Sequence, residues 1–266
     1  MINKVSSIQI GILGGTSSGK TLYLACLQRF FDNFGGGYRV VGADNQSRDW
    51  LEQKKKELQG PLPAGTSVEQ NLNFVLGNNL KRIEISVIDK SGKDFHNHHD
   101  EELINYLADC AGFVILVDPF TSLANQSAFY RPLFESLYMT LFNNEKTMDK
   151  RFSICLTKID DSKFWAWLNE NENNFPKGAG KSNAIFRQWF SEENPADNFA
   201  GVLENLFGAA HFRYHLISSI GFFQRDDGSV SSNLIILDDG SKRLWNGTHY
   251  TPVNLSDPIF WAAGSK

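Results

Sequence analysis

Apolar positions along the chain form two alternating patterns: short continuous runs, and longer segments in which apolar residues recur every three or four positions. The short runs predict buried strands over residues 7–13, 71–76, 82–88, 111–117, 151–156 and 211–217, with a further short strand over 38–41. The longer segments predict helices over residues 20–31, 46–58, 103–109 and 126–142. Because strands alternate with helices, we expect an α/β fold with a doubly wound, mostly parallel sheet and helices on both faces.

The predicted strands over 71–76 and 82–88 differ from the others, since no helix separates them. Gly77-Asn78-Asn79 stands between them, and these residue types tolerate the positive φ of a tight turn. The pair therefore predicts a hairpin that gives the sheet one antiparallel edge strand. Three stretches look weakly structured, and none resembles a long linker between domains: residues 169–182, 191–197 and 225–232.

A glycine-rich segment joins the first predicted strand to the first predicted helix and reads Gly14-Gly15-Thr16-Ser17-Ser18-Gly19-Lys20-Thr21. It matches the pattern GxxxxGK[ST] in the strand–loop–helix context that this pattern requires. Backbone N–H groups of such a loop surround phosphate oxygens, and the positive end of the helix adds to the attraction. Lys20 would reach the β- and γ-phosphates, and the Thr21 hydroxyl would bind Mg²⁺. The alternative is a chance glycine- and serine-rich turn, which the intact context disfavours.

A second motif, Asp89-Lys90-Ser91-Gly92, ends the predicted strand over 82–88. An aspartate at the carboxyl end of a strand can hold Mg²⁺ through water, and the N–H of Gly92 can meet a γ-phosphate. Alone this tetrapeptide carries little weight, because Asp and Gly are common turn residues.

A third motif, Thr157-Lys158-Ile159-Asp160, follows the predicted strand over 151–156. The carboxylate of Asp160 can accept hydrogen bonds from both N1–H and N2–H of guanine, which adenine does not offer. The aliphatic stem of Lys158 can cover the plane of the base. After the last predicted strand, Ser218-Ser219-Ile220 offers a backbone N–H for the guanine O6.

In their order and spacing, the phosphate loop, a switch threonine, DxxG, [NT]KxD and the serine-led loop resemble the TRAFAC-type GTPases, the class that includes the Ras-like small G proteins. The resemblance covers the chain from about residue 7 to residue 221 and implies the G-domain form of the P-loop NTPase fold. The [NT]KxD motif carries Thr157 where Asn is commoner, and this variant keeps the guanine-reading aspartate.

This resemblance implies a GTP- and GDP-binding protein that hydrolyses GTP with the help of Mg²⁺ and acts as a molecular switch for a protein partner. The residues implied in catalysis are Lys20, Thr66 and Gly92, and those implied in metal binding are Thr21, Thr66 and Asp89. The implied nucleotide contacts are Gly14, Gly15, Thr16, Ser17, Ser18, Gly19, Lys20, Thr21, Asp89, Thr157, Lys158, Asp160, Ser218 and Ser219.

The switch threonine is assigned to Thr66, which ends the segment Leu62-Pro63-Ala64-Gly65-Thr66. It precedes a predicted edge strand, where a segment can close on Mg²⁺ and the γ-phosphate. Ser67 is the fallback, and an ordinary proline-rich turn is the alternative. The long segment before Thr66 and the ending Pro258-Ile259-Phe260-Trp261 resemble the bacterial double-GTPase and related prokaryotic families, which are associated with multi-gene conflict and signalling systems. Protein partners in a multi-component system are therefore expected.

One departure from the family pattern concerns hydrolysis. Ras-like enzymes place a glutamine directly after DxxG to orient the attacking water, whereas this chain has Lys93 there. Either hydrolysis is slow and needs a residue from a partner, or a neighbouring group such as Asp94 or His96 positions the water.

Length and composition set the remaining limits. The 266 residues exceed a minimal G domain, and the excess is distributed over insertions at about 35–65 and 161–210 and a C-terminal extension at about 222–266. We therefore expect a single enlarged G domain over 1–266. With 26 basic and 30 acidic residues, the formal charge of −4 gives no general attraction to nucleic acid.

The sequence shows no recognisable signal for export or membrane attachment. No secretory leader, lipidation motif or apolar run of about 18 residues is found, so we expect a cytoplasmic protein without a membrane anchor. The cysteines Cys26, Cys110 and Cys155 are few, widely spaced and close to apolar residues, which favours reduced core thiols.

Three further groups of residues have two interpretations each. Residues 96–102 are rich in His, Asp and Glu, and a solvated switch or helix start is favoured over a metal site. Lys54-Lys55-Lys56 is read as the wet face of a helix rather than a nucleic-acid contact. Trp165, Trp167 and Trp189 are read as core residues, with a partner surface as the alternative.

Two functions compete with a GTP-dependent switch. An ATP-dependent P-loop ATPase or kinase would share the phosphate loop, but Asp160 has no role toward adenine. A GTP-binding scaffold that does not hydrolyse its ligand is suggested by Lys93. Measurement of GTP and ATP affinity, followed by phosphate release, separates the three.

Overall fold

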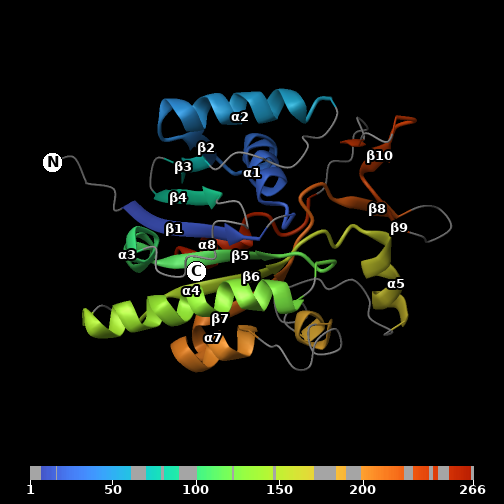
Figure 1. Ribbon diagram of the computed structural model, residues 1–266. Coiled ribbons are helices and arrows are strands. Elements are labelled where there is room, and N and C mark those ends of the chain that lie inside the picture. Colours follow the sequence, from blue (N-terminus) through green and yellow to red (C-terminus); the bar gives the residue numbers. More distant parts are fainter. Residues whose placement is uncertain are drawn as a thin grey trace.

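A seven-stranded sheet in the order β2-β3-β4-β1-β5-β6-β7 forms the centre of the protein (Figure 1). Its strands are β1 (Ser7–Gly14), β2 (Arg39–Gly42), β3 (Gln70–Gly77), β4 (Arg82–Asp89), β5 (Gly112–Val117), β6 (Arg151–Leu156) and β7 (Phe212–Leu216). The computed structural model describes residues 7–15, 17–60, 70–78, 81–89, 101–121, 123–145, 148–170, 184–189, 199–224, 230–239, 242–244 and 252–264.

Strand directions confirm a mostly parallel sheet. β1 lies between β4 and β5 and is parallel to both, and the parallel pairing continues through β6 to β7. The predicted hairpin is also present, since β3 is antiparallel to β4. β3 lies one position in from the edge, however, because the short strand predicted over 38–41 forms as β2 and adds to its outer side.

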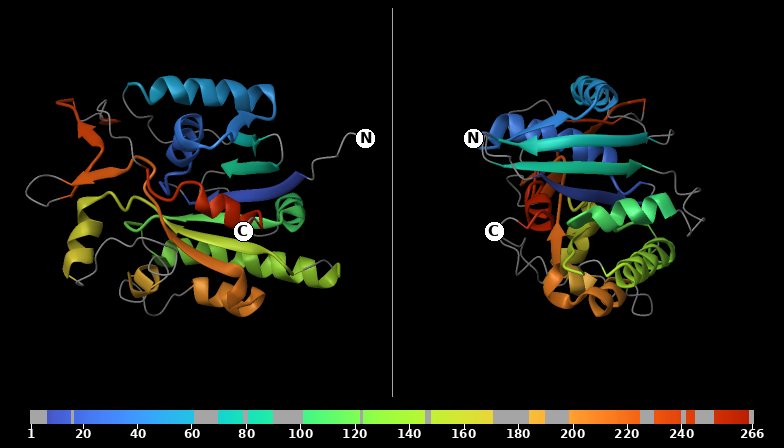
Figure 2. Two further views of the ribbon diagram at one scale, coloured as in Figure 1. Left: turned by 180° about the vertical axis from the view of Figure 1, so that it is seen from behind. Right: turned by 90° about the vertical axis from the view of Figure 1, so that its left-hand side faces the viewer.

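Helices cover both faces of the sheet, as Figures 1 and 2 show. On one face lie α1 (Lys20–Phe34), α2 (Asn45–Glu57) and α8 (Asp257–Ala262). On the other lie α3 (Glu101–Asp109), α4 (Leu123–Asn143) and α7 (Phe199–Phe207), together with a helical stretch over 184–189. α5 (Ser162–Glu170) follows the third sequence motif. The arrangement is the doubly wound α/β fold of P-loop NTPases.

β5, at the centre of the sheet, is apolar along its whole length because helices cover the sheet from both sides. Every residue of β5 is buried. On the α4 side, Phe152 of β6 is fully buried among other rings, with Phe212 stacked at 4.5 Å and Phe207 at 4.8 Å between ring centroids. This aromatic layer holds α4 and α7 against the sheet.

The C-terminal helix α8 packs closely on β5 and β6. A Cβ atom on Gly112 would lie 2.3 Å from the carbonyl oxygen of Ala262, so only glycine permits this approach. The Ser153 hydroxyl donates a hydrogen bond to the carbonyl of Pro258 at 2.7 Å. Pro258 and Ile259 are buried, so these residues of the expected C-terminal extension belong to the core.

The tryptophans divide between core and margin. Trp189 is buried in the layer on the α4 side, which confirms the core interpretation for this residue. Trp165 and Trp167 are partly buried against the same layer. Trp261 is partly buried and lies against the guanidinium of Arg213, 3.9 Å from the ring centroid.

Several elements were not predicted from the pattern. Besides α5, α7 and α8 they comprise the short strands β8 (Phe222–Gln224), β9 (Val230–Ser232), β10 (Leu234–Ile236) and β11 (Lys242–Leu244). β8 pairs with β9 and β10 pairs with β11, both antiparallel. The expectation that 225–232 is weakly structured is therefore wrong for β9. All three cysteines are free and buried, as predicted.

The predicted exposure of the lysine run in α2 needs correction for one residue. Lys54 is not on the wet face of α2: it is buried, and its ammonium bonds to Glu57 at 2.7 Å. Lys55 and Lys56 are exposed. The stem of Lys54 covers apolar surface while its charge stays paired with Glu57.

A histidine is buried in the layer that contains α8. His215 of β7 is 4% exposed, and its Nε2 has no hydrogen-bond partner among the described residues. Burial, with a smaller contribution from the charge of Arg213, lowers the pKa of His215 to about 4. The folded protein therefore holds this histidine neutral under conditions in which an exposed histidine binds a proton.

We expect acidification to destabilise the fold through His215. The unfolded chain, with an ordinary histidine pKa of about 6.5, binds a proton that the folded chain excludes, so the free energy of unfolding falls between about pH 6.5 and pH 4, by up to about 3 kcal/mol. Urea unfolding at pH 7 and pH 5 measures the effect. His215→Gln should flatten the slope. Equal slopes for His215→Gln and the unsubstituted protein would contradict this assignment.

Candidate nucleotide-binding site

The carboxyl ends of the parallel strands bring the sequence motifs to one edge of the sheet (Figure 1). The phosphate loop follows β1, Thr157 follows β6, and Ser218 lies just after β7. Three strand spacings of about 4.8 Å place β1 roughly 14 Å from β7. The groups predicted to bind phosphate and those predicted to bind the base thus lie at opposite ends of one line, beside the point where the strand order reverses.

The phosphate loop forms a tight turn into α1. The N–H of Ser18 donates to the carbonyl of Gly15 at 3.2 Å. Gly19, the residue before α1, has a left-handed backbone with φ of 87°, and Ser17 also has a positive φ of 65°. Among the described residues, no side chain caps this helix start, and its first turn contains no acidic residue. The positive end of α1 is therefore available to an anion.

The interior of the loop excludes any side chain at its first position. A Cβ on Gly14 would lie 2.3 Å from the hydroxyl oxygen of Ser18. That hydroxyl is buried and has no hydrogen-bond partner among the described residues. A buried hydroxyl of this kind in a loop of backbone N–H groups fits an oxygen-rich ligand such as phosphate.

Lys20 extends back along the loop from the first turn of α1. It is buried, and its ammonium donates to the carbonyls of Gly14 at 2.5 Å and Gly15 at 3.3 Å. These bonds hold the charge on the loop where phosphates are predicted. Thr21 is the next residue of α1 and is partly buried. Thr16 lies outside the described residues.

Sequence reasoning missed Tyr130, which fastens the loop to its neighbours. Its hydroxyl donates to the carbonyl of Leu116 at 3.0 Å and accepts the N–H of Gly15 at 3.1 Å. Burial raises the pKa of Tyr130 above its ordinary value, which keeps the hydroxyl protonated as this double role requires. The helical pattern over 126–142 indicated only a packing residue.

Sequence reasoning also missed Asp118, directly after β5. Its carboxylate is almost fully buried, lies 2.8 Å from the ammonium of Lys158, and accepts hydrogen bonds from Phe120 N–H and the Thr121 hydroxyl. It thus fixes the end of the Lys158 side chain. The sequence did contain a signal for it. Asp118 directly follows the apolar run over 111–117, just as Asp89 directly follows the predicted strand over 82–88.

The third motif is anchored to β5 by its first residue. The N–H and hydroxyl of Thr157 both bond to the carbonyl of Val117, at 2.9 and 3.1 Å. Lys158 follows with a positive φ of 55°. The threonine in place of the commoner asparagine therefore secures this turn to the neighbouring strand.

Asp160 receives one serine hydroxyl on each carboxylate oxygen. Ser218 donates to Oδ1 at 2.5 Å and Ser232 donates to Oδ2 at 3.1 Å. Burial raises the pKa of Asp160 above its ordinary value, and the two serine hydrogen bonds act in the opposite direction. The carboxylate is therefore oriented and partly enclosed.

The serine loop is itself fixed by other parts of the chain. Ser218 pairs with Val253 through both backbone groups, at 3.2 and 2.9 Å, and its hydroxyl accepts the N–H of Gly221 at 2.8 Å. Ser219 follows and is partly buried. The structure thus brings Ser218 to Asp160, although the sequence suggested only a backbone contact with a base.

The remaining predicted residues are only partly described. Asp89 ends β4, and because Val87 pairs with Ile12, its backbone lies level with Gly14. The predictions for Thr66, Ser67, Gly92, Lys93, Asp94 and His96 fall outside the described residues. Within the described ranges, no cluster of three or more His, Cys, Asp or Glu side chains is placed to hold a metal ion.

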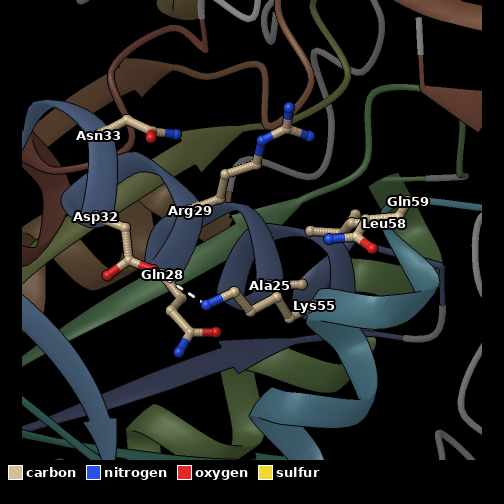
Figure 3. Close-up of a pocket in the computed structure, with 8 residues that line it drawn as sticks. All are labelled: Ala25, Gln28, Arg29, Asp32, Asn33, Lys55, Leu58 and Gln59. Atoms are coloured by element: carbon tan, nitrogen blue, oxygen red, sulfur yellow. Dashed lines mark ion pairs between the residues drawn. The ribbon is translucent and has the colours of Figure 1, made fainter. Parts of the chain in front are cut away.

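A hollow of about 590 Å³ lies elsewhere, between α1 and the end of α2 (Figure 3). Lys55 and Asp32 face each other across it at 3.8 Å, and both are exposed. The hollow begins more than one helical turn beyond Lys20, so it is separate from the phosphate loop. Its lining comprises Ala25, Gln28, Arg29, Asp32, Asn33, Lys55, Leu58 and Gln59.

Comparison with known proteins adds solved structures but no sequence family. No family model matches the chain, and no curated protein sequence matches it significantly. Similar structures include the GTPase-like domain of S. cerevisiae Ski7 bound to GDP and inorganic phosphate, at 15% identity and a TM-score of 0.47 over 80% of this chain and 43% of that one. Ski7 bound to GTP aligns at 16% identity and a TM-score of 0.45, over 84% and 45% of the two chains. Sup35 complexed with GDP aligns at 9% and 0.37, over 81% and 38%.

Each of these alignments spans less than half of the other chain and has a TM-score below 0.5. The P-loop NTPase α/β fold of this chain follows from its own sheet order and from the loop between β1 and α1. Among the described helices, none has the length and apolar character needed to cross a membrane.

Proposed function

We propose that this protein binds GTP and GDP with Mg²⁺, hydrolyses GTP, and serves as a nucleotide-controlled switch for a protein partner. The observation that carries the proposal is the Asp160 carboxylate, held by two serine hydroxyls on the same sheet edge as the phosphate loop. The proposal also includes a single enlarged G domain, a cytoplasmic location and a partner from a multi-component system.

The base end of the site suits guanine. Each oxygen of the Asp160 carboxylate has two lone pairs, so an oxygen that accepts from one serine can also accept from one N–H of a base. Guanine presents N1–H and N2–H side by side, whereas adenine has no N1–H and would place an acceptor against a carboxylate. The Asp118 ion pair fixes the end of Lys158, whose stem is proposed to cover the base plane.

The phosphate end suits a nucleoside di- or triphosphate. Lys20 and the N–H groups of the loop would hold the phosphates, and Thr21, Asp89 and Thr66 are the residues that would hold Mg²⁺. When bound, Mg²⁺ neutralises phosphate charge. Catalysis would then rest on positioning and on charge stabilisation, with Lys20 and the N–H of Gly92 acting on the γ-phosphate.

The hydrolysis step has two forms that Lys93 leaves open. In one, a partner supplies the water-orienting residue and the isolated protein is slow. In the other, Asp94 or His96 orients water within this chain. Single-turnover hydrolysis separates them, since a rate above about 1 per minute exceeds what an unassisted switch GTPase achieves and would exclude the partner-dependent form.

The deciding experiment measures GTP and ATP affinity side by side in the presence of Mg²⁺, followed by phosphate release. We expect a strong preference for GTP and a measurable release of phosphate. Equal or tighter binding of ATP would favour the ATPase or kinase alternative. Tight GTP binding without phosphate release, including after addition of a partner, would favour the non-hydrolysing scaffold.

A further inference from the structure

Part of the base-binding end comes from the C-terminal extension rather than from the four motifs. Ser232 is the last residue of β9, and its hydroxyl supplies the hydrogen bond to Asp160 Oδ2 at 3.1 Å. The next residue, Asn233, is buried and donates through its backbone N–H to Gly221 O at 3.2 Å and through Nδ2 to Ile220 O at 2.9 Å. Two consecutive residues of the extension thus contact both Asp160 of the third motif and the end of the serine loop at Ile220 and Gly221.

The segment that carries these residues is itself packed against the domain. β9 pairs with β8 and packs on α5, which begins just after the third motif (Figure 1). The ring of Phe222 in β8 meets Trp165 of α5 edge-on, with 4.9 Å between centroids. The paired strands β8 and β9 are therefore held in place beside Asp160 by their packing on α5.

The second hydroxyl adds an orientational constraint that the first cannot supply. One donor, Ser218 on Oδ1, leaves the carboxylate able to rotate about its terminal bond, which has a broad energy profile. A second donor on Oδ2 fixes the plane of both oxygens. Two parallel N–H groups of guanine need two coplanar acceptors, since hydrogen bonds weaken steeply as their angles depart from linearity.

We propose that Ser232 is a positioning residue that orients the Asp160 carboxylate for the guanine edge, so that selectivity for guanine depends on the C-terminal extension. Asn233 supports the same arrangement by holding Ile220 and Gly221. This inference rests on the proposed function and concerns a residue outside the motifs by which guanine recognition was identified.

The test compares Ser232→Ala with the unsubstituted protein in GTP and ATP affinity. Loss of a hydrogen bond to a charged group should weaken GTP binding about tenfold and leave ATP binding unchanged. Ser232→Thr, which keeps the hydroxyl, should restore the preference. Ser231→Ala removes a hydroxyl from the opposite side of the same strand and should change neither affinity.

A pH profile distinguishes positioning from a merely structural role. Because the Ser232 hydrogen bond lowers the pKa of Asp160, Ser232→Ala should make GTP affinity fall at a higher pH during acidification. Melting temperatures of all variants report folding separately.

The inference is wrong if Ser232→Ala leaves the ratio of GTP to ATP affinity unchanged, whether both affinities stay the same or both fall equally. Failure of the proposed function has a different signature: the unsubstituted protein would then show no preference for GTP over ATP. The two results are read from different samples, so one cannot be mistaken for the other.

Discussion

Asp160→Asn should abolish the preference for GTP and create binding of xanthosine triphosphate. The substitution replaces one acceptor oxygen with an N–H₂ group, which repels the 2-amino donor of guanine. Xanthine carries a carbonyl oxygen at that position and keeps its N1–H, so the amide matches it with one donor and one acceptor. Loss of charge-assisted hydrogen bonds predicts a fall in GTP affinity on the order of 100-fold.

The fold should tolerate this change. The serine hydroxyls on Asp160 can each donate or accept, so both can adapt to the amide. Burial already opposes the charge of Asp160, so its removal carries little electrostatic cost.

The matched control is Asp161→Asn, at the neighbouring carboxylate that accepts the N–H of Lys163 at the start of α5. It should leave nucleotide selectivity unchanged, because an amide oxygen can still cap the helix. Fluorescence-monitored titrations with GTP, ATP and xanthosine triphosphate give the result. Unchanged GTP affinity together with equal binding of ATP would remove Asp160 from the site and, with it, the guanine assignment.

Lys20→Met should remove affinity for GTP and ATP together. The ammonium is buried on the phosphate loop, bonded to the carbonyls of Gly14 and Gly15, where it would meet the β- and γ-phosphates. Methionine has a similar length but no charge or donor. Loss of charge-assisted bonds to two phosphates predicts a fall in affinity on the order of 100-fold or more for both nucleotides.

Lys55→Met provides the matched control, because this lysine is exposed on α2 and paired only loosely with Asp32 at 3.8 Å. It should bind nucleotide like the unsubstituted protein. Calorimetric titration measures the affinities, and thermal unfolding verifies that both variants fold. Retention of nucleotide affinity in a folded Lys20→Met protein would show that the loop is not the phosphate site.

Together the two substitutions test the two ends of the site separately. Asp160→Asn changes which base is accepted, whereas Lys20→Met weakens binding whatever the base. A ligand that spans the sheet edge from β1 to β7 predicts this difference, because the two residues follow different strands.

The sequence predicted those structural features of the candidate site that depend on local pattern and strand order. The loop around Lys20 follows from a contiguous motif between a strand and a helix. The placement of Ser218 and Asp160 at one sheet edge follows from parallel strands, although the hydrogen bond between their side chains was not predicted. Both inferences need only the order of elements along the chain.

The missed residues act through contacts that no local pattern encodes. Tyr130 reaches Gly15 from α4, and Ser232 reaches Asp160 from a strand in a stretch judged weakly structured. A tyrosine in a helical pattern is ordinarily a packing residue, and a serine in a polar stretch is ordinarily solvated. The residue types therefore gave no sign of these tertiary contacts. The prediction that Lys54 is exposed was wrong for a related reason, since its burial depends on how α2 lies against the sheet.

The position of α8 has a consequence for synthesis of the protein. Val253 pairs with Ser218, the Leu255 carbonyl accepts the hydroxyl of Tyr23 at 2.7 Å, and α8 closes over β5 and β6. Chains emerge from the ribosome in order, and N-terminal segments fold first when their contacts are local. Here the phosphate loop emerges early, whereas Ser218 gains its backbone partner Val253 only when a segment much later in the chain follows. The two ends of the proposed nucleotide site therefore form at different times during synthesis, and the base end is completed only after residue 253 has emerged.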